Sequence, residues 1–205
     1  MPDILKSFGW LSRSDGRLGD IYGVSFIRDL SPREVLTRLG VNPDTIEEMT
    51  FDELDEYVDE CLAVPGGEAE HVGAVKVDGW TILVEPSGWR VAAEPGVLER
   101  VSRGTEVVSV NRHDYASDRF IHAIDGDVIT RFDPLVPHLR SGTDPDRWAD
   151  QMRDVGLGRR TFEDPIPGDH IAGAFALASI ITGVNFSRNV LDMTFLGAAI
   201  DSDRP

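Results

Sequence analysis

The sequence predicts an α+β fold: a mainly antiparallel sheet of about five to six strands packed with helices, with a helical C-terminal third. Three observations support this prediction. Six short segments alternate apolar and polar residues and are mostly joined by tight turns, which favours antiparallel pairing. Helices with clear start signals lie before and between these segments. Further helical patterns follow them, and this order is typical of the α+β class.

The first 20 residues predict a short helix and a loop. Apolar residues recur at helical spacing over 4–11, and turn-forming residues follow over 12–19. Apolar and polar residues then alternate over 21–28, which predicts the first strand.

Two capping patterns predict the next helices. Ser31, Pro32 and Glu34 open the first as a capping box with proline at the first helical position. Thr50 and Glu53 form a second box. The apolar spacing of this second helix predicts five inward-facing residues: Phe51, Leu54, Tyr57, Val58 and Cys61.

Two hairpins are predicted from Asp-Gly pairs, which tolerate the positive φ angles of a type I′ turn. Asp78-Gly79 joins strands 72–77 and 80–85, and Asp125-Gly126 joins strands 119–124 and 127–132. Between the hairpins we expect a helix over 95–103 and a strand over 105–112.

The last third is expected to be helical. One helix is predicted over 144–155, and a central buried helix over 170–182 is capped by Asp169. A final helix is predicted after Ser187, with Leu191, Phe195 and Leu196 on it.

Chain length and cysteine content bound the class of protein. The 205 residues, 1–205, are expected to form a single domain that buries roughly 70% of its surface. A domain of this size does not need disulfide bonds or a structural metal to be stable. The only cysteine, Cys61, excludes an internal disulfide, and the N-terminus lacks the pattern of a secretory signal. We therefore expect a cytoplasmic protein.

The charge is concentrated in one segment. The chain carries 36 acidic and 20 basic residues, a net charge of −16. Eleven of the acidic residues, and no Lys or Arg, fall in an acidic helical segment over 44–70, which leaves −5 for the rest. Because such an excess repels phosphate and anionic lipid, we expect no direct binding of nucleic acid and no membrane binding.

The acidic residues of the second capped helix must crowd its outer side, since its apolar residues claim the inner one. We call the following five residues the acidic face: Asp52, Asp55, Glu56, Asp59 and Glu60. Such a face is either a docking surface for a basic protein partner or a solvated helix side that keeps the chain soluble. The sequence leaves both interpretations open.

Catalytic and cofactor motifs are missing from the sequence. The glycines at 156 and 158 lack the third glycine of a dinucleotide fingerprint, and Ser87 lacks the flanking glycine of a nucleophile elbow. Cys61 is expected on the inner side of the acidic helix, where it fills the core and the negative field keeps it a protonated thiol. We predict no cofactor.

The five histidines do not predict a metal site. None pair at the i,i+4 spacing of a helical zinc site, and no cysteine cluster joins them. His122 shares a strand face with Phe120 and Ile124, which is typical of a hydrogen-bonded, half-buried histidine rather than a base.

Aromatic residues suggest a second candidate site. Trp80 begins a strand and Trp89 follows the turn after it, so they share a site only if the turn folds back. The other interpretation is that both tryptophans close the core. The possible pocket comprises Trp80, Glu85, Trp89, Arg90, His122 and Arg131.

Short motifs also follow one another in a fixed order, at 79–89, 102–105, 108–110, 125–126, 132–134 and 142–146. In this order they resemble an uncharacterised actinobacterial domain family, the domain of unknown function 6461, from about residue 22 to about residue 183. The resemblance implies a bacterial domain and lends no catalytic residue. We assign the acidic helix to no part of this pattern.

We expect a non-catalytic domain that presents the acidic face to a basic partner, as an immunity or regulatory factor would. The alternative is an enzyme or small-ligand receptor with a pocket near Glu85, Trp89, His122 and Arg131. A subunit of a larger assembly is a third class. The strand order and the oligomeric state do not follow from the sequence.

Overall fold

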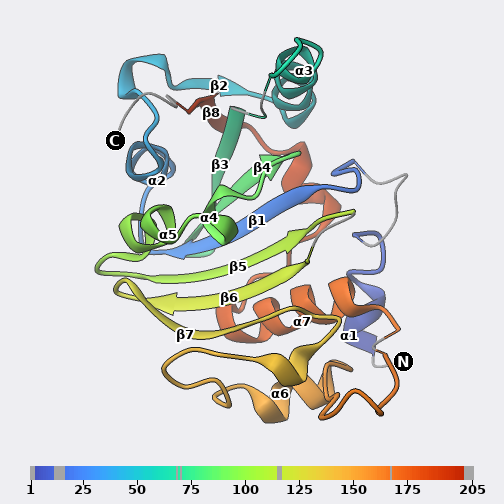
Figure 1. Ribbon diagram of the computed structural model, residues 1–205. Coiled ribbons are helices and arrows are strands. Elements are labelled where there is room, and N and C mark those ends of the chain that lie inside the picture. The colour runs from blue at the N-terminus through green and yellow to red at the C-terminus, as the bar shows by residue number, and fades with distance from the viewer. Residues whose placement is uncertain are drawn as a thin grey trace.

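An antiparallel sheet of eight strands forms the centre of the fold in a computed structural model that describes residues 3–11, 17–67, 69, 71–114, 117–166 and 168–200 (Figure 1). The strand order is β2-β8-β3-β4-β1-β5-β6-β7. The strands are β1 (Tyr22–Arg28), β2 (Glu47–Met49), β3 (His71–Val77), β4 (Trp80–Pro86), β5 (Glu106–Arg112), β6 (Arg119–Ile124), β7 (Asp127–Phe132) and β8 (Phe195–Ala199). The α+β class and the antiparallel sheet are confirmed, but the predicted five to six strands are too few.

Helices cover both faces of this sheet (Figure 1). The first face packs against α1 (Asp3–Lys6), α3 (Phe51–Leu62), α6 (Ala149–Asp154) and α7 (His170–Thr182). The second face packs against α2 (Pro32–Leu39), α4 (Arg90–Ala93) and α5 (Pro95–Ser102). Short 3₁₀ helices are η1 (Pro43–Thr45), η2 (Pro137–Leu139) and η3 (Arg188–Asp192). Within the described ranges, no helix combines the length and the apolar character that a membrane span requires.

The six predicted strands and both hairpin turns form as the sequence indicates. Asp78 and Gly79 have φ angles of 45° and 84°, and Asp125 and Gly126 have φ angles of 50° and 88°. Two consecutive positive φ angles define a type I′ turn, whose twist matches that of the flanking strands.

The predicted capping box of α3 is complete. The hydroxyl of Thr50 accepts the backbone N–H of Glu53 at 3.2 Å, and the Glu53 carboxylate accepts the N–H of Thr50 at 2.7 Å. In α2 only half of the predicted box forms. Ser31 accepts the N–H of Glu34, but the Glu34 carboxylate pairs with Arg38 at 3.0 Å instead.

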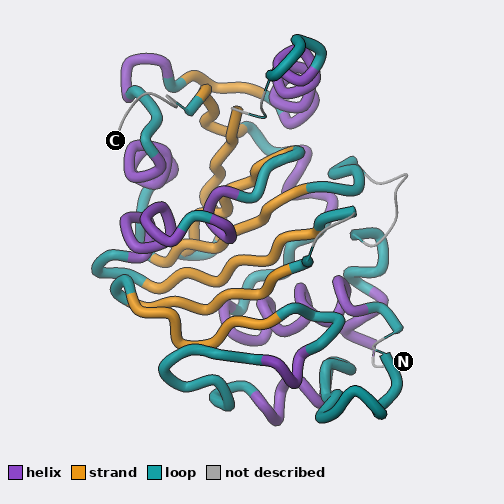
Figure 2. The backbone as a smooth tube through the Cα atoms, viewed as in Figure 1, coloured by secondary structure: helices purple, strands orange, loops and turns teal. Residues whose placement is uncertain are grey.

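The C-terminal third is not clearly helical, which corrects the prediction (Figure 2). The buried helix α7 forms with Asp169 as its cap, but the helix predicted over 144–155 shrinks to α6. After Ser187 the chain forms η3 and then β8, which pairs with both β2 and β3. Pairing on both sides outweighs the helix propensity of the Leu and Ala residues in β8.

In the acidic segment 44–70, η1 and β2 precede the helix α3. Most of the turn-rich stretch predicted over 12–19 lies outside the described residues, as do Glu68 and Glu70.

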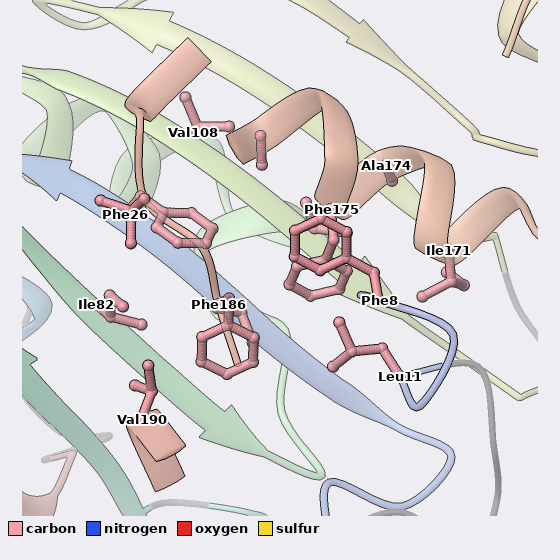
Figure 3. Packing of buried hydrophobic residues seen from close by; sticks show 14 of the residues in the cluster. Phe8, Leu11, Phe26, Ile82, Val108, Ile171, Ala174, Phe175, Phe186 and Val190 are labelled. Carbon is pink, nitrogen blue, oxygen red and sulfur yellow. The ribbon is translucent and has the colours of Figure 1, made fainter. Parts of the chain in front are cut away.

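Separate hydrophobic cores lie on the two faces of the sheet. On the first face, Phe8, Phe26, Phe175 and Phe186 pack between the sheet and α7 (Figure 3). The rings of Phe175 and Phe186 stack with centroids 5.6 Å apart. On the second face, aliphatic residues of β1, β4, β5 and β6 pack against α2, α4 and α5. Successive strand residues therefore contribute to different cores.

The edge of the sheet at β7 is covered by its own following loop. The backbone N–H groups of Thr143 and Asp144 donate to the carbonyl oxygens of Val128 and Ile129, and Ser141 forms a bridge with Arg131. Gly142 makes this close approach possible: it has a φ of 132°, and a Cβ there would lie 2.2 Å from the carbonyl oxygen of Ile129. The loop thus satisfies hydrogen-bonding groups that would otherwise be open to another chain.

Substitution of Gly142 by alanine should destabilise the protein by at least about 2 kcal/mol, because it adds a backbone clash to an unfavourable φ. Gly104→Ala is the matched control. Gly104 has a φ of 67°, but no atom lies within 4 Å of the place that a Cβ would take, so only about 1 kcal/mol is expected. Urea denaturation measures the free energy of unfolding of both variants. An equal loss of unfolding free energy in the two variants would contradict the role given to the edge loop.

Candidate functional site

The acidic face of α3 is built by the helix period. Phe51, Leu54 and Val58 are buried toward the sheet. As a result Asp52, Glu56, Asp59 and Glu60 are exposed, whereas Asp55 is half-buried. Burial, followed by the neighbouring charges of Asp59 and Asp52, raises the pKa of Asp55. The helix therefore presents a crowded row of carboxylates to solvent.

A cation distant in the sequence compensates part of this charge. Arg17 pairs with Asp52 at 2.7 Å and with Asp192 at 2.6 Å, and its guanidinium lies 5.3 Å from the ring centroid of Phe51. These pairs are largely solvent-exposed, so each contributes little to stability. They compensate only the first turn of α3.

Exposed apolar side chains adjoin the acidic face. Tyr57, Leu62 and Val64 are 39%, 44% and 60% exposed. Tyr57 stacks on His71 with ring centroids 5.1 Å apart, and the Cys61 thiol lies 3.7 Å from His71 Nδ1. The prediction that Tyr57 and Cys61 face the core is therefore wrong: both lie to one side of the buried row, over the start of β3.

A cavity of about 370 Å³ lies at the C-terminal end of α3. The residues that line it include Leu62 and Ala69 together with Trp89, Arg90 and Glu94. Trp89 is 37% exposed and contacts His113 edge-to-face, with ring centroids 4.5 Å apart. Trp89 thus neither closes the core nor meets Trp80.

Glu85 lies buried beneath the corner between β4 and α4. One of its oxygens accepts the backbone N–H of Arg90 at 2.6 Å. Its carboxylate lies over Gly23 of β1, where a Cβ would come within 2.9 Å of Oε2. Burial raises the pKa of Glu85 to about 7. The hydrogen bonds that its carboxylate accepts from the N–H groups of Arg90 and Val91 act in the opposite direction, but burial has the larger effect. Glu85 therefore anchors the start of α4.

The other members of the possible pocket lie elsewhere. Trp80, at the opposite end of β4, belongs to the core of the first face beneath Arg28. His122 is on the first face, whereas Glu85 is on the second, because the register of β4, β1, β5 and β6 sets their side chains on opposite sides. Arg131 is on β7, four strand spacings or about 19 Å from β4. A single pocket of these six residues does not form.

His122 has a structural role. The indole N–H of Trp148 donates to Nδ1 at 3.0 Å, so the proton of the neutral ring is assigned to Nε2, which donates to Glu106 at 2.9 Å. Burial lowers the pKa of His122. The hydrogen bond with Trp148 thus joins the start of α6 to β6, and the hydrogen bond with Glu106 joins β6 to β5.

A second cavity, of about 290 Å³, adjoins the ends of β6 and β7. Its lining includes Asp118, Arg119, Arg131, Asp133 and Ser141, of which only Arg131 is a candidate from the sequence. These residues were missed because the hairpin register brings them together. A shift between His122 and Ala123 sets Phe120 opposite Phe132, which places the neighbouring Arg119 and Asp133 at the same end of the hairpin.

Replacement of Glu85 by glutamine should change how stability depends on pH. A carboxyl group with a pKa of 4.5 unfolded and about 7 folded keeps its proton longer in the native state, so stability falls as pH rises between these values. At about 1.4 kcal/mol per pKa unit, the fall is on the order of 3 kcal/mol.

Glutamine cannot ionise but keeps an oxygen that accepts the N–H of Arg90. Between about pH 5 and about pH 8, the unfolding free energy of the unsubstituted protein should therefore fall, whereas that of Glu85→Gln should not show this fall. The difference in unfolding free energy between the two proteins should thus shift in favour of the variant as pH rises. Urea denaturation at both pH values measures this. A constant difference between the two proteins would refute the assignment.

The matching family model is that of a family of unknown function, DUF6461, and the match covers residues 2–204. This confirms the resemblance that the order of the sequence motifs indicated. No curated protein and no solved structure matches the chain. The chain belongs to the family of unknown function DUF6461.

Proposed function

We propose that this chain is a non-catalytic protein-binding domain whose acidic face docks on a basic partner protein. The observation that carries the proposal is the state of Glu56, Asp59 and Glu60. All three carboxylates are exposed on a capped helix, and none forms an ion pair with a described residue. Their charge is available to a partner.

The electrostatic argument follows from their spacing. Asp52 and Glu56, and likewise Asp55 and Asp59, are like charges at i,i+4, each pair costing a few tenths of a kcal/mol. A basic partner would remove this repulsion and be steered toward α3 by the negative field. Glu47 and Glu48 on the edge strand β2 are also exposed and extend the same sign of charge.

The neighbouring apolar residues favour docking over mere solubility. Protein interfaces combine aromatic and aliphatic anchors with a charged rim. The exposed Tyr57, Leu62 and Val64 supply such anchors beside the carboxylates. A helix face that served only to keep the chain soluble has no need of them.

An immunity or regulatory factor in the bacterial cytoplasm would work in this way. Its acidic helix would occupy the basic surface with which a nuclease or another nucleic-acid-binding partner contacts phosphate. The alternative, an enzyme or receptor with a pocket near Glu85, Trp89, His122 and Arg131, has no such support, because these residues are dispersed.

Charge reversal tests the proposal. In a pull-down from native-host lysate, a variant with Glu56→Lys, Asp59→Lys and Glu60→Lys should recover at least tenfold less partner protein than the unsubstituted chain. Quantitative mass spectrometry measures the amount recovered. The melting temperature of the variant should not fall, because the substitutions relieve repulsion on an exposed surface.

A matched control carries Asp114→Lys, Asp127→Lys and Glu163→Lys, three exposed positions away from α3, and changes the net charge equally. This control should capture the partner as the unsubstituted chain does. If all three proteins capture the same set at low salt, where surface electrostatics are strongest, the proposal is wrong.

A further inference from the structure

The cavity at the ends of β6 and β7 is lined by Arg131 and Asp133, two opposite charges that form no ion pair with each other. Arg131 donates through Nε to the hydroxyl of Ser141 at 3.2 Å and forms no ion pair with a described residue. Asp133 accepts the backbone N–H of Leu135 at 2.8 Å and likewise forms no ion pair within the described part of the chain. A guanidinium and a carboxylate in one cavity thus keep unused hydrogen-bonding capacity.

Arg119 adds a second guanidinium to the same lining. It is the first residue of β6, next to Phe120, which pairs with Phe132 at the end of β7, and one of its terminal nitrogens donates to the carbonyl oxygen of Ala92 at 3.0 Å. The remaining donors of this side chain carry no ion pair with the described residues. Two arginines and two carboxylates, Asp118 and Asp133, therefore line one cavity at the ends of adjacent strands.

The surrounding contacts hold this arrangement in place. Asp118 accepts the backbone N–H of His113 and the Nε2–H of His170, both at 2.8 Å, which fixes the chain just before β6. Beneath the cavity the rings of Phe120 and Phe132 stack with centroids 4.9 Å apart. These contacts hold the backbone around the cavity, which lowers the entropic cost of binding.

We propose that this cavity binds a small zwitterion of the α-amino acid class. An arginine fork matches the two oxygens of a carboxylate, and the Asp133 carboxylate is an acceptor for an ammonium group. The charges of Asp118 and Asp133 balance those of Arg119 and Arg131, which favours a ligand of no net charge over a phosphate-rich one.

The size of the cavity agrees with a small ligand. The volume of about 290 Å³ is near the lower end of the range for small-molecule sites, roughly 300–1,000 Å³. Partial burial, followed by the charge of Asp118, raises the pKa of Asp133. An ammonium group placed beside this carboxylate would compensate for its lost hydration.

Calorimetric titration of the full chain with each of the twenty amino acids tests the proposal. At least one should bind with a Kd below about 1 mM, the range of a weak but specific small ligand. For the amino acid that binds, its deaminated carboxylic acid and its amide are the comparators, and each should bind at least tenfold more weakly. Absence of binding by all twenty, or equal binding of the deaminated acid, overturns the proposal.

Variants locate the site. Arg131→Gln and Asp133→Asn should each weaken binding at least tenfold. The matched controls are Arg103→Gln on the surface and Asp127→Asn at the turn end of the same strand, and both should bind like the unsubstituted chain. Circular dichroism and melting temperature show whether each variant is folded. A folded Arg131→Gln variant with unchanged affinity overturns the assignment.

Discussion

The central strand β1 is buried on both faces, and this constraint governs which side chains can meet. Residues 22–27 are all buried, with β4 on one side of the strand and β5 on the other. Because each face carries its own core, strand register decides the side on which any polar residue emerges. Glu85 and His122 are thereby separated, and each is engaged in anchoring a different helix, α4 and α6.

Local signals were enough to predict most of the sheet and several helix ends. Asp-Gly pairs and the Thr50 cap act through contacts a few residues apart, so they can be read without knowing the fold. The short strands β2 and β8 escaped prediction because their own residues do not favour a strand. Glu47-Glu48 are extended because they pair with Leu196 and Gly197 of β8, and Ala198-Ala199 because they pair with β3.

The two candidate sites differ in the same way. The acidic face is contiguous in sequence and lies on one helix, so residue spacing alone located it. Nothing in the sequence indicated that Arg17 compensates part of the negative charge of this face, since Arg17 is 35 positions from Asp52. The β6–β7 cavity depends on a register shift at His122 and on a loop that returns along β7. Neither event has a sequence signal as direct as a turn or a cap.

The position of the two sites on one sheet implies that they act independently. The acidic face lies beside β2, β8 and β3, whereas the β6–β7 cavity lies at the other end of the sheet (Figure 1). A ligand changes affinity at a distant site only if it binds two states of the protein differently. The strands between the two sites are packed on both faces. A close-packed interior of this kind resists the rearrangement that would be needed to couple the sites. Charge reversal on α3 should therefore leave the affinity for an amino acid unchanged, which separates a failure of one proposal from a failure of the other.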